Sequence, residues 1–184
     1  MSFRQNIVNN FMRTLPPTRF YPLKTKLMAW AGYTVHPTAR IVSSVQIWGQ
    51  MPLFIGEDTF IGHEVLITGS EARIHIGNFV DIAPRVCIIS GTHYIDMQGQ
   101  HVAGQGNSLP IVIEDGAWIG AGTTVIGGVT VGKKAVIGAG SVVVNDIPPF
   151  CVAVGNPCRS IKYWNAFTEE WVQPLNRLNN QKNI

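Results

Sequence analysis

Residues 111–143 read IVIEDGAWIGAGTTVIGGVTVGKKAVIGAGSVV, and in this stretch a β-branched residue returns at every sixth position. The series runs Ile113, Ile119, Val125, Val131, Ile137 and Val143. Six residues make one short strand and one turn, so this period places the β-branched side chains at equivalent points of successive strands. The stretch predicts a solenoid in which three strands form one coil and the coils stack.

The same period extends toward the N-terminus. Three earlier triplets have this spacing: Val35, Ile41, Ile47; Ile55, Ile61, Ile67; and Ile76, Ile82, Ile88. All fifteen positions are Ile or Val, although these two types make up only 39 of the 184 residues, so chance does not explain the pattern. We expect an all-β solenoid, a parallel β-helix of about five coils whose equivalent residues stack about 4.8 Å apart.

One long interruption and two flanks complete the predicted organisation. Ile76 and Ile113 are 37 residues apart, which is one coil of 18 plus 19, so a long loop over about 93–110 follows the third coil. Loops of this length in a solenoid are usually functional. The exposed edges at both ends of a β-helix need caps.

We expect short helices as these caps. Leu23, Leu27 and Trp30 fit an amphipathic helix before the first coil, and Ile161, Trp164, Phe167 and Trp171 have helical spacing after the last one. The predicted divisions are residues 1–32 as a basic arm with a helical cap, 33–150 as the β-helix, and 151–184 as a C-terminal tail with a helix.

Composition excludes several classes of protein. With 46% hydrophobic and 14% charged residues, the chain is neither disordered nor a coiled coil, and no apolar stretch approaches the roughly 18 residues that cross a bilayer. Cys87, Cys151 and Cys158 are far apart in sequence, which favours a reducing, cytoplasmic location over a disulfide framework or zinc knuckle. The net charge of +3 is too small to indicate nucleic-acid binding.

The N-terminal arm is basic, and it lacks the pattern of a secretory signal. Residues 1–56 contain no acidic residue and six basic ones: Arg4, Arg13, Arg19, Lys24, Lys26 and Arg40. Phe11, Phe20, Tyr21 and Trp30 interleave with them. Two interpretations remain open: a cap whose cations face water, or a peripheral contact with anionic lipid at the inner face of a membrane.

Three motifs carry a resemblance to a known family. They are Ser90-Gly91-Thr92-His93-Tyr94-Ile95-Asp96, Trp118-Ile119-Gly120-Ala121, and Asp146-Ile147-Pro148-Pro149 followed by Gly155-Asn156-Pro157-Cys158-Arg159. With the repeat, they make residues 33–163 resemble the hexapeptide-repeat O-acetyltransferases that act on sugars, such as maltose and galactoside acetyltransferases. The resemblance implies a left-handed β-helix, a homotrimer with sites between subunits, acetyl-CoA as donor and no metal.

The implied chemistry needs a base that takes a proton from a sugar hydroxyl while its oxygen attacks a thioester. Neutral imidazole suits this near pH 7, and His93 resembles the catalytic histidine of the family. Asp96 or Glu64 would hold its second nitrogen. Asp81 is placed similarly to Glu64 and is a candidate substrate contact; the alternative for both is a solvated carboxylate. His101 is a surface or substrate-contacting residue.

The resemblance also implies contacts to the donor. The backbone N–H of Ala121 would stabilise the oxyanion, and Trp118 would line the acceptor or pantetheine channel or simply pack between coils. The implied acetyl-CoA contacts are Gly120, Gly138, Ala139, Asn145, Arg159 and Lys162.

Three other patterns fit worse. Residues 127–134 read GGVTVGKK, which differs from a P-loop because Lys134 stands where the Mg²⁺-binding Ser or Thr would be. The stretch also keeps the hexapeptide register, so we expect it to be part of a coil. His93 and His101 are eight residues apart, wider than the zinc-ligand spacing of γ-class carbonic anhydrases, which share this fold. The cysteines have no evident activating partner, so a thiol nucleophile is not expected.

The sequence therefore predicts an acetyl-CoA-dependent O-acetyltransferase for a sugar or a polysaccharide or lipopolysaccharide precursor. Two alternatives stay open. One is transfer to another small acceptor, an amine or an antibiotic hydroxyl, because the same base and thioester geometry serve both. The other is a structural β-helix without catalytic activity, which predicts no acyl-CoA binding.

Overall fold

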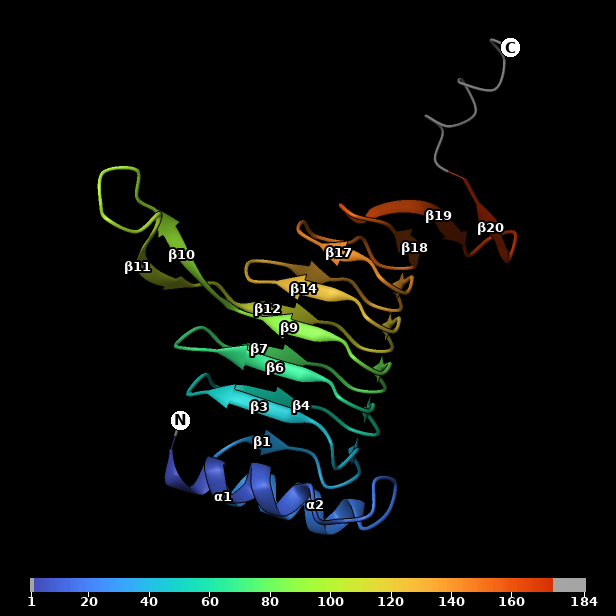
Figure 1. The fold of residues 1–184 in the computed structure, drawn as a ribbon. Helices are drawn as coiled ribbons and strands as arrows, with labels where there is room; N and C mark the ends of the chain where they lie inside the picture. Colours follow the sequence, from blue (N-terminus) through green and yellow to red (C-terminus); the bar gives the residue numbers. More distant parts are fainter. Residues whose placement is uncertain (1, 174–184) are drawn as a thin grey trace.

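The computed structural model describes residues 2–173, which form a parallel β-helix closed at one end by two helices (Figure 1). The helices are α1 (Phe3–Met12) and α2 (Tyr21–Trp30). No helix in this part of the chain has the length and hydropathy that crossing a bilayer requires.

Three sheets make the sides of the β-helix, and the chain passes through them in turn. Sheet A contains β1 (Thr34–Val35), β4 (Leu53–Ile55), β7 (Ile74–Ile76), β12 (Ile111–Ile113) and β15 (Thr130–Val131). Sheet B begins with β2 (Arg40–Ile41), β5 (Phe60–Ile61), β8 (Asp81–Ile82), β13 (Trp118–Ile119) and β16 (Val136–Ile137). Sheet C contains β3 (Gln46–Gly49), β6 (Leu66–Gly69), β9 (Cys87–Ile89), β14 (Thr124–Ile126) and β17 (Val142–Val143).

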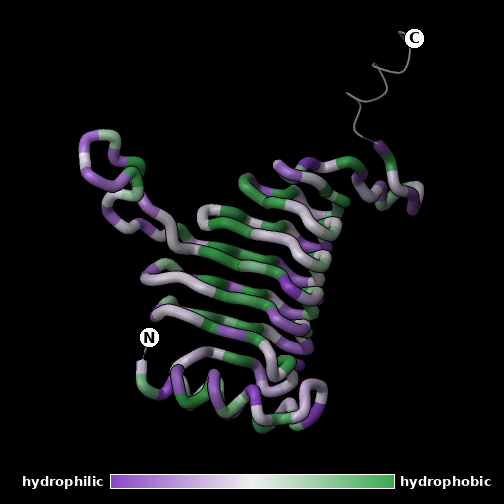
Figure 2. Tube along the Cα trace, in the orientation of Figure 1, coloured by the Kyte–Doolittle hydropathy of each residue, from purple (hydrophilic) through white to green (hydrophobic). Residues whose placement is uncertain are grey.

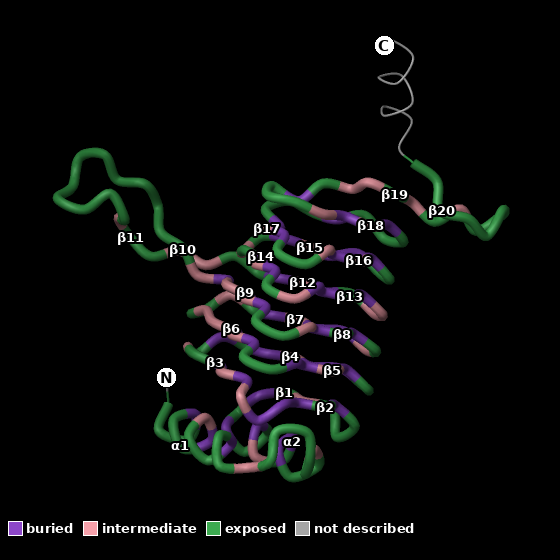
Figure 3. The backbone as a smooth tube through the Cα atoms, turned by 45° about the vertical axis from the view of Figure 1, so that its right-hand side comes forward, coloured by how far each residue is buried: buried purple, intermediate pink, exposed green. Residues whose placement is uncertain are grey.

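The β-branched residues stack as the period of six predicts. In sheet B, Ile41, Ile61, Ile82, Ile119 and Ile137 are register partners one above the other. The predicted residues of sheets A and C form two equivalent columns. All fifteen except Val35 are buried, and they form the core that runs along the stack (Figures 2 and 3).

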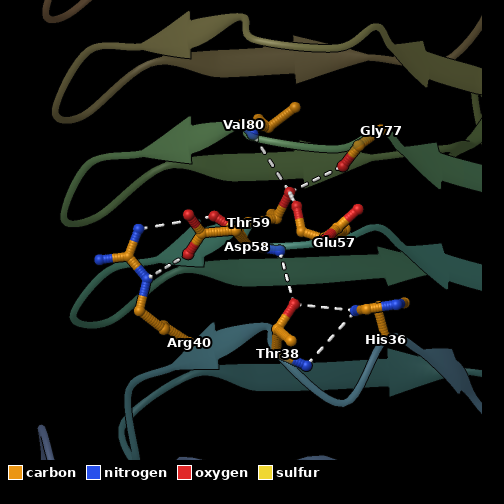
Figure 4. A network of polar contacts seen from close by, with 8 residues as sticks. All are labelled: His36, Thr38, Arg40, Glu57, Asp58, Thr59, Gly77 and Val80. Carbon is orange, nitrogen blue, oxygen red and sulfur yellow. Dashed lines mark hydrogen bonds and ion pairs between the residues drawn. The ribbon is translucent and has the colours of Figure 1, made fainter.

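Small polar side chains join the coils at the corner between sheets A and B (Figure 4). The buried Thr59 hydroxyl donates to the Gly77 carbonyl at 2.7 Å and accepts from the Val80 N–H at 3.1 Å. One coil below, Thr38 Oγ1 accepts from the Asp58 N–H at 2.9 Å. The turn positions of the repeat therefore favour small residues because each side chain bonds the coil above it.

The N-terminal cap contains one more helix than the sequence predicts. The expected helix is α2, while α1 begins with a capping box in which Ser2 Oγ accepts from the Gln5 N–H and Gln5 Oε1 accepts from the Ser2 N–H. Val8 and Met12 of α1 and Met28 of α2 pack on the core. The helices thus cover the edge that the first coil leaves open.

A buried lysine fixes the segment between the two helices. Lys24 Nζ donates to the carbonyls of Pro16 and Pro17 at 3.0 and 2.6 Å, and Ser43 Oγ also donates to Pro16 at 3.0 Å. Burial lowers the pKa of Lys24. The amine serves structure here, because it satisfies carbonyl groups that no helix pairs.

The predicted C-terminal helix is wrong for the residues that the structure describes. Sheet B continues instead through β18 (Cys151–Val154), β19 (Arg159–Asn165) and β20 (Glu170–Val172), the last two antiparallel. Trp164 and Trp171 are cross-strand partners whose rings meet edge to face at 5.4 Å. The edge of β16 offers backbone hydrogen bonds that a strand satisfies and a helix does not, and residues 174–184 lie outside the described part.

The predicted long loop is a β-hairpin that projects from the stack between β9 and β12 (Figure 1). Its strands are β10 (Gly91–Ile95) and β11 (Ala103–Ser108), which pair antiparallel. Figure 3 shows that the hairpin is exposed along nearly all its length, in contrast to the coils.

Gly49 and Gly140 differ in how closely a neighbouring coil approaches them. Gly49 and Gly140 both have positive φ, +107° and +70°. A Cβ on Gly49 would collide with the Gly69 carbonyl of the next coil, whereas a Cβ on Gly140 would meet nothing within 4 Å. We predict that Gly140→Ala lowers the unfolding free energy by about 1–2 kcal/mol, the cost of positive φ alone, and Gly49→Ala by about 3 kcal/mol or more. Equal losses in urea titrations of the two variants would contradict this packing.

Candidate functional site

His93 lies on β10, near the base of the hairpin, and the opposite strand holds its ring. His93 Nδ1 is 2.8 Å from the carbonyl oxygen of Gly104 on β11. The two residues lie close because β10 and β11 pair with His93 opposite Gly106. The ring is exposed, so its other nitrogen faces an accessible region.

This contact selects the tautomer of the neutral ring. A carbonyl oxygen only accepts hydrogen bonds, so Nδ1 must carry the proton at 2.8 Å from Gly104. The lone pair then lies on Nε2. Neutral His93 is therefore arranged as a base at Nε2.

A cleft lies beside the hairpin, and His93 is on its wall. The cleft that His93 lines has a volume of about 330 Å³ and lies between the hairpin and sheet C. It is bounded by Thr68, Gly69, Ser70, Ile89, Gly91, Thr92, His93, Gly106 and Asn107. Three hydroxyl groups and one amide supply both donors and acceptors around the imidazole.

Asp96 shapes the tip of the hairpin in this chain. Its Oδ1 accepts from the backbone N–H groups of Gln98 and Gly99 at 2.9 and 2.8 Å. These two bonds lower the pKa of the Asp96 carboxyl. Within residues 2–173, no hydrogen bond or ion pair joins Asp96 to His93.

The other predicted carboxylates lie away from the hairpin in one chain. Glu64 stands at the corner between sheets B and C, has φ +58°, and donates its N–H to Ser44 Oγ at 3.0 Å. Asp81 is an exposed residue of β8, directly beside Trp118 of β13 on the outer face of sheet B. Trp118 is 55% exposed, so it does not pack between coils in the single chain.

The predicted oxyanion donor and part of the acetyl-CoA contact set share one corner. Gly120 and Ala121 follow β13, and Gly138 and Ala139 follow β16 in the next coil. A Cβ on Gly120 would lie 2.6 Å from the Ala139 nitrogen, so the coils approach closely there. Among the described residues the Ala121 N–H has no acceptor, while that of Gly122 donates to Pro84 at 3.0 Å.

The remaining predicted residues form a separate group near the last strands. Asn145 and Arg159 line a cleft of about 390 Å³ together with Asp146 and Tyr163. Lys162 is exposed on β19, opposite Val152. His101 lies in the exposed tip of the hairpin, eight residues beyond His93 in the sequence.

The His, Cys, Asp and Glu side chains of the described residues bear on metal and thiol chemistry. Residues 2–173 contain no group of three or more His, Cys, Asp or Glu that could hold a metal ion. Burial raises the pKa of Cys151, and burial is also the first cause of the raised pKa of Cys158. Both thiols are therefore held in the poorly nucleophilic protonated form.

Sequence reasoning missed Gly104 as the partner of His93. Its contribution is a backbone carbonyl, which every residue type carries, so no side-chain pattern reveals it. The one signal in the sequence is that residue 104 is glycine. A Cβ there would lie 2.8 Å from Asp96 Cβ and 3.1 Å from the Tyr94 carbonyl, so a larger residue would not fit between the strands. Only glycine lets the two strands approach closely enough for this contact.

The repeat and the sequence of this chain match known proteins. Residues 110–145 match the family model described as bacterial transferase hexapeptide (six repeats). The chain is 37% identical over 113 residues to a galactoside O-acetyltransferase of Escherichia coli, an alignment covering 61% of this chain and 55% of that protein. The chain spans about half the length of the first curated relatives it matches.

Solved structures agree over a larger part of the chain. A maltose O-acetyltransferase from Clostridium difficile has a TM-score of 0.68 at 29% identity, covering 86% of this chain and 83% of that one. A hexapeptide-repeat acetyltransferase from Vibrio cholerae, in complex with acetyl-CoA, has a TM-score of 0.69 at 26% identity, covering 88% and 86%. The predicted resemblance to hexapeptide-repeat sugar O-acetyltransferases is confirmed, and the repeat with these neighbours implies a left-handed β-helix.

The tautomer of His93 can be measured directly. We predict that two-dimensional ¹⁵N spectra of histidine-labelled protein, recorded where the ring is neutral, show a protonated Nδ1 and an unprotonated Nε2 for His93, because the Gly104 carbonyl accepts from Nδ1. His101, which has no hydrogen bond among the described residues, serves as the internal reference for a free ring. A proton on Nε2 of neutral His93 would contradict the assignment.

Proposed function

We propose that this chain is an acetyl-CoA-dependent O-acetyltransferase, built on a left-handed β-helix of five coils, that transfers an acetyl group to a hydroxyl of a sugar or polysaccharide precursor. The observation that carries the proposal is His93, whose Nδ1 lies 2.8 Å from the Gly104 carbonyl and whose Nε2 is thereby left as the basic nitrogen. The similarity to galactoside and maltose O-acetyltransferases supports the reaction class. The acetyl-CoA complex of the Vibrio cholerae protein supports the donor.

The proposed transfer is direct and needs no acyl-enzyme. His93 Nε2 takes the proton of the acceptor hydroxyl while that oxygen forms a bond to the thioester carbonyl carbon. The carbonyl electrons move to the oxygen, and the Ala121 N–H stabilises the resulting oxyanion. When the intermediate collapses, the C–S bond breaks, and the CoA thiolate takes the proton back from the His93 imidazolium.

The lining of the cleft favours a hydroxylated acceptor over an apolar one. Thr68, Ser70, Thr92 and Asn107 surround His93 with groups that both donate and accept. A sugar presents several hydroxyl groups at fixed angles, and such groups match these side chains in pairs. An amine acceptor would use the same base, so an acceptor panel that includes amino sugars distinguishes the two reactions.

The proposed enzyme is a homotrimer with its sites between subunits. In one chain His93 lies at the corner between sheets C and A, whereas Ala121 lies at the corner between sheets B and C. The width of sheet C therefore separates the proposed base from the proposed oxyanion donor. A neighbouring copy that brings its own Ala121 corner to the hairpin would complete the site, with Trp118 and Asp81 beside the acceptor.

The donor would extend along the stack from this site. Gly120, Gly138 and Ala139 would receive the pantetheine arm where the coils leave room for a close main-chain approach, and Asn145, Arg159 and Lys162 would lie toward the phosphates. The free thiols Cys87, Cys151 and Cys158 suit the reducing cytoplasm, where we propose that the reaction takes place.

Enzyme kinetics test the proposed base. His93→Ala should lower acetyl transfer to the best sugar acceptor by at least about a hundredfold, with acetyl-CoA affinity retained, because only proton removal is lost. Free thiol release measures turnover, and calorimetry measures donor binding. His36→Ala, a change in the first coil, is the matched control and should keep its activity. Full activity of His93→Ala would exclude it as the base, and absence of acetyl-CoA binding by the wild-type protein would favour a structural β-helix.

Two variants of Asp96 distinguish between two roles for its carboxylate. Asp96→Asn should keep activity within a few-fold of wild type, because an amide carbonyl accepts from Gln98 and Gly99 as the carboxylate does. Asp96→Ala removes both bonds and should lower turnover more than Asp96→Asn. A carboxylate that orients the imidazole in the assembled enzyme would instead make Asp96→Asn lose roughly 10³-fold or more. Steady-state kinetics of the two variants decide between the roles.

A further inference from the structure

The outer side of α1 is unusually apolar for a surface helix. Phe3, Ile7 and Phe11 are four residues apart and thus follow one line along the helix. They are 78%, 41% and 46% exposed, while Val8 and Met12 face the core. A helix that only caps a solenoid needs one apolar side, so this second apolar side requires another explanation.

The second helix adds to the same exposed surface. α1 and α2 lie side by side across the N-terminal end of the stack (Figures 1 and 3). Leu23 and Trp30 of α2 are 42% and 47% exposed, and the Arg4 guanidinium lies 5.4 Å from the centre of the Trp30 ring. This contact joins the exposed sides of the two helices.

The charges at this end are of one sign. Arg4, Arg13, Arg19 and Lys26 are exposed, and none of them forms an ion pair within residues 2–173. Because residues 1–56 contain no acidic side chain, the two helices and the first coil carry no negative side chain of their own to offset these cations. Lys24 does not add to the surface, since it is buried against Pro16 and Pro17.

We propose that the helical end, meaning the exposed side chains of residues 3–30, binds the surface of an anionic phospholipid bilayer. Phe3, Ile7, Phe11, Leu23 and Trp30 would enter the boundary between headgroups and acyl chains, while the cations contact the headgroups. The combination of unpaired cations with exposed aliphatic and aromatic residues is the chemistry that an anionic lipid surface satisfies. The proposal goes beyond acyl transfer and does not depend on it.

Other occupants fit the helical end less well. A second copy packed end to end would place four cations against four cations, which like-charge repulsion opposes. A nucleic acid would satisfy the cations but leave Ile7 and Leu23 exposed, because aliphatic side chains do not pair with phosphates or stack on bases. Of these three occupants, the lipid surface is the one that satisfies both groups of residues.

The arrangement also gives the bound protein an orientation. The helices form one end of the stack, and the hairpin with His93 projects from its side (Figure 1). With the helical end on a bilayer, the coils would stand away from the membrane and the hairpin would stay accessible above the headgroups. An acceptor anchored in that bilayer would reach the hairpin from below.

Vesicle flotation of the full chain tests the proposal. We expect binding to vesicles of phosphatidylglycerol mixed with phosphatidylcholine, little binding to phosphatidylcholine alone, and weaker binding when salt rises from about 0.1 M to about 0.5 M. Arg13→Gln with Lys26→Gln should lower the partition coefficient roughly 25-fold, about fivefold for each cation. Phe3→Ser with Phe11→Ser should lower it by at least about tenfold.

Matched variants elsewhere on the surface complete the experiment. Arg85→Gln with Lys133→Gln removes the same charge, and Phe79→Ser with Phe167→Ser removes two exposed phenylalanines; both pairs should bind as wild type does. Circular dichroism and sedimentation check the fold and oligomeric state of each variant. Absence of vesicle binding, equal binding to neutral vesicles, or equal losses in test and control pairs would overturn the proposal. A change of oligomeric state confined to the test pairs would assign the surface to another copy instead.

Discussion

The stacking of β-branched side chains at every sixth residue is the constraint on which this molecule depends. Each coil buries its apolar side chains only between the coils above and below, so neighbouring coils must keep the same register. The column from Ile41 to Ile137 keeps that register through five strands of sheet B. The stacked β-branched side chains fill the interior. Residues with chemical roles must therefore lie on the outer faces, at corners, or on segments that leave the stack.

The hairpin shows how such a segment keeps its position. It leaves after Ser90, which is fully buried, and it returns where the Leu109 N–H donates to the Ser90 carbonyl at 3.0 Å. The two ends are therefore fixed by the ladder, and the antiparallel pairing carries this order outward to His93. An exposed imidazole is thus held by backbone geometry rather than by burial.

Most of the fold is predictable from the sequence because the six-residue repeat is local and periodic. The prediction fails at the C-terminal end, where strand pairing depends on the open edge of a strand that lies earlier in the sequence. Ile161, Trp164 and Trp171 have the spacing of a helix, but the open edge of β16 recruits β18, and the following residues pair back upon it. In the candidate site, the motif predicts His93 as the base, because the histidine side chain carries a chemical signal. The Gly104 carbonyl carries none, so the partner of the imidazole becomes visible only when the two strands of the hairpin are paired.

The hydrogen-bond partner of His93 Nδ1 is a neutral backbone carbonyl, and this partner affects the proton transfers of the proposed reaction. A carboxylate beside Nδ1 would stabilise the imidazolium strongly and hold the proton after the hydroxyl has given it up. A neutral carbonyl fixes the tautomer equally well but stabilises the charge less. In a direct transfer the imidazolium must return its proton to a leaving thiolate, whose conjugate acid has a pKa of only about 8.5. The weaker partner therefore favours this return, and it leaves Asp96 free to shape the tip of the hairpin.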